Sequence, residues 1–374
     1  MRAIRRRDFN YDVTRTYNTM VNAGEDIGTT EYLIKPDGTL SSPAVGTLGC
    51  WVQIKKKGED WETMALTNYH VVRPALKGFR LKKEGESLLP SIPDGESPCW
   101  KGDKNGLWPK RLANRDNRNE PTTDIEHPAR AKHNFSVTEL LEEIKTRPTS
   151  ARQNRLSDWI AFFDQDKHLL GNIWLASGYK HRTKPESRSD GEPTGRLDWA
   201  LIQPVDTCRI GVNKLPTETN WDSKYSIGNA PDPVTFGNTL KSQGVSLHDF
   251  VQGGNVYKVG ASTKWTAGEF SNFKTNCSVA EDGYLGMGKS GEYVVIGKVN
   301  NDESSIPFAN KGDSGSVVWG QDGRVLGLLF EGQQPQSNDD GYSFVTPIED
   351  VFDHIKGFGM LELGGAVVED IRLA

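Results

Sequence analysis

Three side chains in this sequence have the chemistry of an activated serine nucleophile. A serine hydroxyl attacks weakly until an imidazole takes its proton, and that imidazole needs a carboxylate to fix its tautomer and stabilise its cation. The three groups lie in separate short segments, which are LTNYHVV around His70, LDWALI around Asp198 and KGDSGS around Ser314. Because each segment joins strand-like residues to a turn, we expect the three side chains to converge where strands end.

Alternating apolar residues and turn residues predict two groups of short strands that would position these side chains. The first group comprises residues 46–54, 61–67, 159–163, 169–176 and 199–203, and the second comprises residues 255–259, 293–299, 316–319, 324–330 and 342–345. Regularly spaced strands bounded by Gly, Asn or Asp are typical of β-barrels. We therefore expect an all-β protein with one barrel for each group.

Two helices are predicted beside the strands. A polar stretch at about residues 82–155 indicates an insertion, in which the capping box SVTE at residues 136–139 predicts a helix ended by Pro148. The segment TPIE at residues 346–349 predicts a C-terminal helix that stops at Gly357 and packs one apolar face on the second barrel.

These patterns divide the chain into four parts. Residues 1–44 lack strand periodicity and form an N-terminal extension, and residues 357–374 form a tail. The first barrel subdomain comprises residues 45–215 with the insertion at about 82–155, and the second comprises residues 216–356 with the C-terminal helix.

The composition excludes several classes of protein. With 374 residues, of which 35% are hydrophobic and 25% charged, the chain can fold around a sizeable core. A formal net charge of −5 provides no general attraction to nucleic acid or anionic lipid, and no run of about 18 apolar residues exists to span a membrane. We therefore expect a soluble protein without nucleic-acid or membrane partners, and no oligomeric state is predicted.

The cysteines and the N-terminus bear on cofactors and location. Cys50, Cys99, Cys208 and Cys277 are widely spaced and lack the CxxC pairs of metal sites, so we expect free thiols and neither a metal nor an organic cofactor. No apolar stretch follows the Arg-rich N-terminus, so no secretion signal is predicted. Both features favour a cytoplasmic or nuclear location.

The three ordered motifs resemble those of the trypsin-like serine peptidases of the chymotrypsin clan. LTNYHVV is similar to their histidine motif, DWALI to their aspartate motif and GDSGS to their nucleophile motif, and VYKVGASTKWTAGEF, RVLGLLFEG and TPIEDVF extend the resemblance over about residues 46–356. The resemblance implies two six-stranded antiparallel barrels in the chymotrypsin-like arrangement. It also implies a serine endopeptidase that acts on protein or peptide substrates through an acyl-enzyme.

The resemblance assigns roles to individual residues. His70 becomes the general base, Asp198 orients it, and Ser314 attacks the substrate. The backbone N–H groups of Gly312 and Ser314 would form the oxyanion hole. The substrate-binding positions implied are Phe308 for the pocket floor and Phe330, Glu331 and Gly332 for its wall and for pairing with the peptide.

The residue at the pocket floor bears on substrate preference. Phe308 stands where trypsin-type enzymes carry an acidic residue, so an apolar or small P1 side chain is favoured. Glu331, or Asp339 and Asp340, are alternatives that would place a carboxylate near the pocket.

The sequence departs from the digestive members of the family in two respects. No Ile-Val-Gly-Gly-like segment follows a basic cleavage site, so Asp313 has no evident new amino terminus as a partner. Val71 replaces the cysteine that follows the histidine in secreted members. Both features are more similar to intracellular members.

Alternatives exist for one residue and for the function. Asp158 also precedes Trp and apolar residues, but Asp198 is preferred because a polar turn and Leu215-Pro216 follow it, where one barrel would lead to the next. The long insertion suggests a scaffold that binds partners without cleaving them. An esterase on another fold fits less well, because α/β-hydrolases use GxSxG and the order serine, aspartate, histidine.

Overall fold

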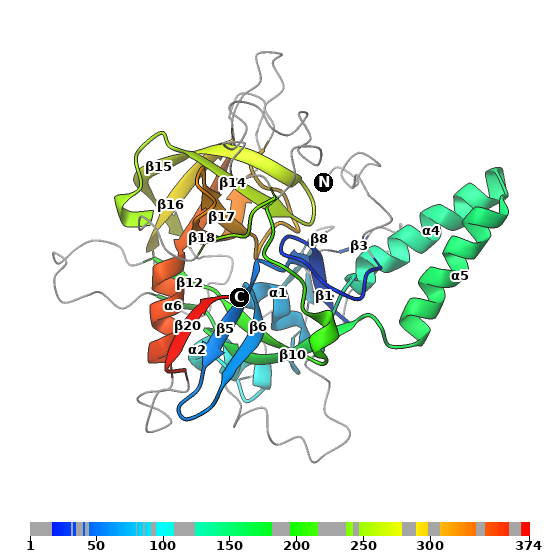
Figure 1. Cartoon of the computed structure of the whole chain (residues 1–374), viewed down its shortest axis with the longest axis horizontal. Coiled ribbons are helices and arrows are strands. Elements are labelled where there is room, and N and C mark those ends of the chain that lie inside the picture. The colour runs from blue at the N-terminus through cyan, green and yellow to red at the C-terminus, as the bar shows by residue number, and fades with distance from the viewer. Residues whose placement is uncertain are drawn as a thin grey trace.

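The structure, a computed structural model, consists of a closed β-barrel, a curled β-sheet and a projecting pair of helices (Figure 1). The described residues are 17–30, 33–34, 40–41, 45–79, 81–84, 87–90, 95–107, 124–181, 195–215, 237–241, 247–278, 289–297, 307–333, 341–358 and 368–374.

Six antiparallel strands close into the second barrel. Its strands are β14 (Asn255–Gly260), β15 (Lys264–Ser278), β16 (Lys289–Gly297), β19 (Tyr342–Pro347), β18 (Val325–Gln333) and β17 (Val317–Gly320), in that order around the barrel. Apolar side chains at alternate positions, such as Val256 on β14 and Phe270 on β15, fill its interior. This barrel was predicted from the sequence, and the prediction is confirmed.

The first group of strands forms a curled sheet of eight strands. Its order is β20 (Asp370–Leu373), β5 (Cys50–Lys55), β6 (Trp61–Thr67), β13 (Ala200–Pro204), β10 (Leu169–Ala176), β9 (Asp124–Glu126), β1 (Asp26–Thr29) and β4 (Gly46–Thr47). Eight strands are present where the resemblance implied six, and three of them were not predicted: β1 comes from the predicted extension, β9 from the predicted insertion and β20 from the predicted tail. The all-β class and double-barrel arrangement are nevertheless confirmed, whereas the subdomain boundaries remain a prediction.

Three short two-stranded sheets accompany the main ones. They are β2 (Leu33–Ile34) with β3 (Leu40–Ser41), β7 (Leu81–Glu84) with β8 (Ser87–Pro90), and β11 (Lys180–His181) with β12 (Arg196–Leu197). The last pair matters for the site, because β12 leads directly into Asp198.

The polar insertion contains helices, one of which corrects a prediction. α4 (Arg130–Thr146) and α5 (Ser150–Asp164) form a hairpin that projects from the body in Figure 1. Residues 159–163, expected as a strand, lie in α5 because Thr149 caps that helix and Trp159, Phe162 and Phe163 follow helical spacing on its buried face. The predicted capping box lies inside α4, which starts six residues earlier.

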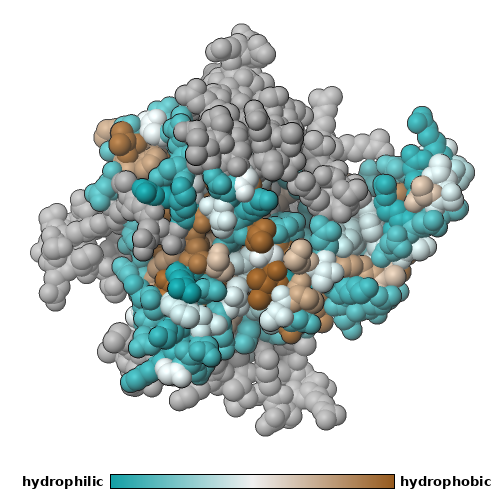
Figure 2. Space-filling model, viewed as in Figure 1, coloured by the Kyte–Doolittle hydropathy of each residue, from teal (hydrophilic) through white to brown (hydrophobic). Residues whose placement is uncertain are grey.

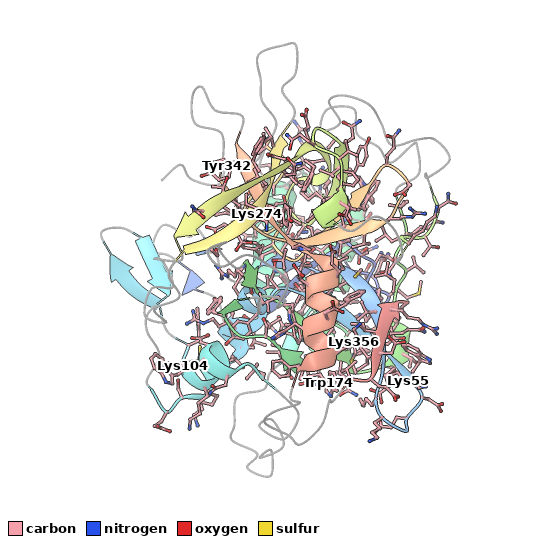
Figure 3. All side chains as sticks on the ribbon, turned by 90° about the vertical axis from the view of Figure 1, so that its left-hand side faces the viewer. Lys55, Lys104, Trp174, Lys274, Tyr342 and Lys356 are labelled. Carbon is pink, nitrogen blue, oxygen red and sulfur yellow. The ribbon has the colours of Figure 1, made fainter. Side chains whose placement is uncertain are left out.

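The remaining helices are short except for the C-terminal one. They are α1 (Tyr69–Val72), α2 (Pro98–Asn105), α6 (Ile348–Gly357) and the 3₁₀ turns Arg73–Ala75, Thr207–Arg209 and Leu247–Asp249. α6 confirms the predicted C-terminal helix and stands beside β20 in Figure 3. Its N-cap is Pro347 and not Thr346, whose hydroxyl instead donates to the carbonyl of Arg196 at 3.1 Å.

An apolar core runs from the first sheet into the second barrel. One continuous cluster contains Leu66 and Trp199 from the sheet, Tyr257 and Trp319 from the barrel, and Val351 from α6. Figure 2 shows apolar atoms gathered near the middle of one face, whereas α4 and α5 are mostly hydrophilic. Burial of this shared apolar cluster fixes how the first sheet and the second barrel meet, and the candidate site lies along their junction.

Several sequence predictions concern what the protein lacks. The described side chains of Cys50, Cys99 and Cys208 are free thiols, as predicted, and the side chain of Cys277 lies outside the described part. Among the described residues, no helix is long and apolar enough to cross a membrane, and no cluster of three His, Cys, Asp or Glu side chains is arranged to hold a metal.

Candidate active site

His70 lies on the short helix α1, immediately after strand β6. Two hydrogen bonds fix this connection, one from the Thr67 hydroxyl to the carbonyl of Thr47 at 2.8 Å, the other from the Asn68 amide to the carbonyl of Asp198 at 2.6 Å. Because Asn68 is fully buried, this second bond ties the start of α1 to the segment that carries Asp198.

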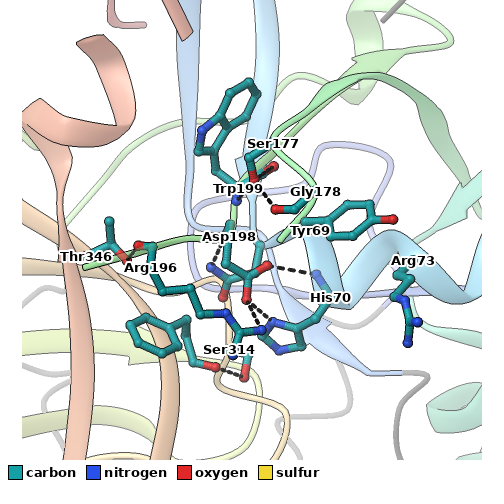
Figure 4. A network of polar contacts seen from close by, with 12 residues as sticks. Tyr69, His70, Arg73, Ser177, Gly178, Arg196, Asp198, Trp199, Ser314 and Thr346 are labelled. Carbon is teal, nitrogen blue, oxygen red and sulfur yellow. Dashed lines mark hydrogen bonds and ion pairs between the residues drawn. The ribbon is translucent and has the colours of Figure 1, made fainter. Parts of the chain in front are cut away.

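Asp198 holds the imidazole of His70 in one orientation. Its Oδ2 lies 2.7 Å from His70 Nδ1, and its Oδ1 accepts the backbone N–H of His70 at 2.9 Å (Figure 4). The Asp198 side chain is 1% exposed and that of His70 28%. An ionised carboxylate can only accept, so Nδ1 is the donor and Nε2 remains for acid–base chemistry.

The electrostatic surroundings keep Asp198 ionised. Burial alone would raise the pKa of its carboxyl, but His70, Arg196 and the hydrogen bonds outweigh burial and lower the pKa to about 2. Arg196 Nη2 lies 3.3 Å from Asp198 Oδ2. Asp198 is therefore an anion throughout the neutral pH range.

Ser314 lies in a tight loop of the second barrel between two glycines with positive φ. Gly312 has φ +97° and Gly315 has φ +96°, values that favour glycine. A Cβ on Gly315 would also lie 2.3 Å from the Thr67 hydroxyl oxygen, so the loop approaches the end of β6 closely.

Direct hydrogen bonds hold this loop against the first sheet. The backbone N–H of Thr47 donates to the carbonyl of Ser314, and the Thr47 hydroxyl donates to the carbonyl of Gly312, each at 2.8 Å. Since Thr67 bonds Thr47 and lies three residues before His70, one chain of contacts links the serine loop to the histidine.

The hydroxyl of Ser314 is not yet paired with the imidazole. It donates to the carbonyl of Phe330 at 3.1 Å (Figure 4), and no hydrogen bond joins it to His70 in the described part of the chain. Catalytic hydrogen bonds are often long or absent before substrate binds.

The backbone N–H groups of this loop differ in their partners. Asp313, Gly315 and Ser316 each donate their N–H to a backbone carbonyl, at 2.9 to 3.0 Å. By contrast, the N–H groups of Gly312 and Ser314 have no acceptor among the described residues. Two such donors are what a developing oxyanion requires.

Asp313, next to the serine, anchors the loop inside the barrel. Its carboxylate accepts the backbone N–H groups of Ser262, Thr263 and Asn310 at 2.8 to 3.1 Å, and Lys258 Nζ lies 3.2 Å away. The side chains of Lys258 and Asp313 are both fully buried. The side chain of Lys258 is therefore a partner of Asp313 that comes from within the chain.

One known family matches part of the chain. Residues 207–361, which contain Ser314 and the second barrel, match the family described as peptidase family S64. This part of the chain, less than half of its length, is therefore similar to a family of peptidases. No curated protein matched the sequence.

Solved structures similar to this chain are distant in sequence. Protease A of Thermobifida fusca has 11% identity, covering 90% of this chain and 95% of that chain, with a TM-score of 0.38. The Nocardiopsis protease has 9% identity, covering 94% and 98%, with a TM-score of 0.40. A Cellulomonas bogoriensis chymotrypsin has 13% identity, covering 54% and 75%, with a TM-score of 0.30. The fold of this chain is therefore assigned from its own strand topology.

The remaining predicted residues lie in different surroundings. Asp158, the alternative acid, is exposed on α5, while Asp198 contacts His70. Phe308 is buried in the core of the second barrel, where it packs and does not face solvent. Phe330 is buried, and Glu331 and Gly332 are exposed farther along β18. The alternatives Asp339 and Asp340 lie outside the described residues.

Sequence reasoning missed three residues that hold the candidate site together. Lys258 sits within the apolar run VYKVG, where a lysine looks like a solvent-facing residue of a strand. Arg196 ends a charged turn, and Thr47 is one of many threonines in the chain. Only Arg196, two residues before Asp198, had a position that could have drawn attention.

Proposed function

We propose that the chain is an endopeptidase in which His70, Asp198 and Ser314 act as a catalytic triad through an acyl-enzyme. The observation that carries the proposal is the pairing of His70 with the buried, ionised Asp198, beside a serine loop bonded to the same sheet. Such a pair supplies a base for a serine hydroxyl, and the proposed mechanism uses no cofactor.

The first half of the reaction forms the acyl-enzyme. Rotation about χ1 of Ser314 breaks its bond to the Phe330 carbonyl and directs Oγ to His70 Nε2. Nε2 takes the hydroxyl proton as Oγ attacks the peptide carbonyl carbon. The oxyanion accepts the free N–H groups of Gly312 and Ser314, and collapse expels the amine, which takes the proton from His70.

The second half regenerates the enzyme. A water molecule gives its proton to His70 Nε2 and attacks the acyl carbon, so that a second oxyanion forms in the same hole. Collapse releases the carboxylic acid product and returns the proton to Ser314 Oγ. Asp198 stabilises the imidazolium in both halves without taking its proton.

Substrate binding is proposed along strand β18. Glu331 and Gly332 are exposed directly after Phe330, whose carbonyl faces the serine, so an extended peptide can add to this edge through its backbone. The free thiols support a reducing compartment, such as the cytoplasm or nucleus.

Turnover of a peptide library by purified protein tests this function. We expect cleavage by the wild type and at least a ~10⁴-fold loss in Ser314→Ala and in His70→Ala. Ser157→Ala, which removes an exposed hydroxyl on α5, is the matched control and should keep full activity. Peptide binding with no turnover by the wild type would instead support a non-cleaving scaffold.

A further inference from the structure

Arg196 is a buried cation beside the candidate triad, and it belongs to none of the sequence motifs. It lies on β12, two residues before Asp198, and its side chain is 10% exposed. Its Nη2 lies 3.3 Å from Asp198 Oδ2, the same oxygen that lies 2.7 Å from His70 Nδ1. Figure 4 shows the guanidinium reaching the carboxylate alongside the imidazole.

Two aromatic rings hold this guanidinium in place. Its central carbon lies 4.7 Å from the ring centre of Tyr179, which follows β10 of the first sheet. It also lies 5.5 Å from the ring centre of Phe330 on β18 of the second barrel. A planar cation packed near two rings has little freedom to leave the carboxylate.

The backbone of Arg196 is attached to the second barrel. Its N–H donates to Glu292 Oε1 on β16 at 2.6 Å, and its carbonyl accepts the Thr346 hydroxyl on β19 at 3.1 Å. Arg196 therefore bridges the two units, because its side chain contacts the triad acid and its backbone contacts the barrel that carries Ser314.

Other ionisable groups also surround this position. Glu292 faces Arg196 from β16, and Tyr179 faces it from the first sheet. Arg73, paired with the buried Asp103, lies 5.4 Å from the Tyr179 ring centre. His354 on α6 accepts the indole N–H of Trp199, the residue after Asp198. Arg196 itself contacts an oxygen of Asp198, at 3.3 Å.

We propose that Arg196 is a positioning residue of this peptidase, holding the Asp198 carboxylate toward His70 and coupling that orientation to the barrel carrying Ser314. The inference rests on the proposed triad. The lowered pKa of Asp198, to which Arg196 contributes after His70, is consistent with this role.

Loss of the cation has a distinctive effect on the pH profile. Arg196 and protonated His70 share one carboxylate oxygen, so the guanidinium competes with the imidazolium for its charge. Without that competition, protonated His70 is more stable and the unprotonated base appears only at higher pH. The acid limb of kcat/KM should therefore move up by about one pH unit.

The experiment compares Arg196→Met, which keeps a long stem, with Arg196→Lys, which keeps the charge. In Arg196→Met we expect kcat to fall about 10- to 100-fold with KM little changed, and the acid limb to move up. Arg196→Lys should keep the acid limb within about 0.3 pH unit of the wild type. Its kcat should still fall several-fold, because an ammonium lacks the planar fork.

The control is Arg130→Met. Arg130 on α4 likewise pairs with a buried carboxylate, that of Glu126, and lies over the ring of Phe163, but far along the chain from the triad segments. It should lower the melting temperature without moving the acid limb. This variant separates loss of packing from loss of the charge beside Asp198.

Each outcome decides between the claims. If the Ser314→Ala variant keeps the turnover of the wild type, the proposed function itself is contradicted. Turnover that depends on Ser314, with an unmoved acid limb in a folded Arg196→Met, overturns the role of Arg196 alone. If Arg196→Met does not fold, Arg196→Lys still decides, since an unchanged kcat in that variant rejects the positioning role.

Discussion

Two buried aspartates lie in the candidate active site, and their partners differ. Asp198, at the end of the first sheet, shares one oxygen between Arg196 and an imidazole that is 28% exposed. Asp313, in the second barrel, faces the fully buried ammonium of Lys258 and accepts three backbone N–H groups. The first carboxylate has a partner that can exchange protons with substrate, while the second has only fixed donors.

The difference suits Asp198 to a part in the reaction and Asp313 to a part in holding the fold. Burial lowers the pKa of Lys258, and Asp313 opposes that shift by stabilising the ammonium. The pair thereby fixes the loop before Ser314, and with it the free N–H groups of Gly312 and Ser314. Asp198 should therefore govern rate, and Asp313 with Lys258 should govern folding and loop geometry.

The largest expected effect comes from Asp198→Asn. The amide keeps the shape but no longer holds Nδ1 as a donor, so kcat should fall about 10⁴-fold. Circular dichroism should remain close to that of the wild type. A fall of less than tenfold would mean that Asp198 does not orient the base.

Lys258→Met should act on stability first. Removing one partner of a buried ion pair leaves an uncompensated charge on Asp313, which costs about 3–5 kcal/mol of unfolding free energy, measured in urea. Lys56→Met is the matched control, because Lys56 packs on Trp174 and pairs with Glu62 at the surface. It should cost less than about 1 kcal/mol. Equal costs in the two variants would contradict the contrast.

Acid unfolding tests how much the ionised Asp198 contributes to the unfolding free energy. The pKa of its carboxyl is about 2 in the folded protein against 3.8 for an ordinary aspartate. Its ionised form therefore stabilises the fold above about pH 4, and roughly 2 kcal/mol of that stability is lost as the pH falls towards 2. The wild type should lose this amount between pH 4 and 2 relative to Asp198→Asn, and parallel curves would refute the assignment.

The smallest expected effect concerns Thr47, which connects the first sheet to the serine loop of the second barrel. The Thr47 hydroxyl donates to the carbonyl of Gly312 and accepts the N–H of Ala261 at 3.0 Å. Thr47→Val should cost about 1–2 kcal/mol of unfolding free energy and lower kcat/KM several-fold. Thr138→Val, on exposed α4, is the control and should change neither quantity.

The sequence predicted those parts that local pattern determines. Alternating apolar residues predicted β5, β6 and five of the six strands of the second barrel, all but β15, and the order of three motifs predicted His70 and Asp198, which do contact each other. It could not assign residues 159–163, since the run WIAFF suits a buried strand as well as a helix face.

Features that depend on tertiary contacts were not predictable. Strand β20 has four residues and joins the first sheet only through pairing with β5, more than 300 positions earlier. Lys258 is buried because Asp313 meets it from a distant loop, and Phe308 packs in the barrel core although its position suggested a pocket floor. Such long-range pairings leave no local periodicity in the sequence.

Covalent labelling of Ser314 tests the central claim most directly. Purified protein is treated with a fluorophosphonate probe, digested and analysed by mass spectrometry, with Ser314→Ala and His70→Ala in parallel. We predict one adduct, on the peptide containing Ser314, absent from Ser314→Ala and formed far more slowly in His70→Ala. An adduct on another residue, or none in the active wild type, would contradict the triad.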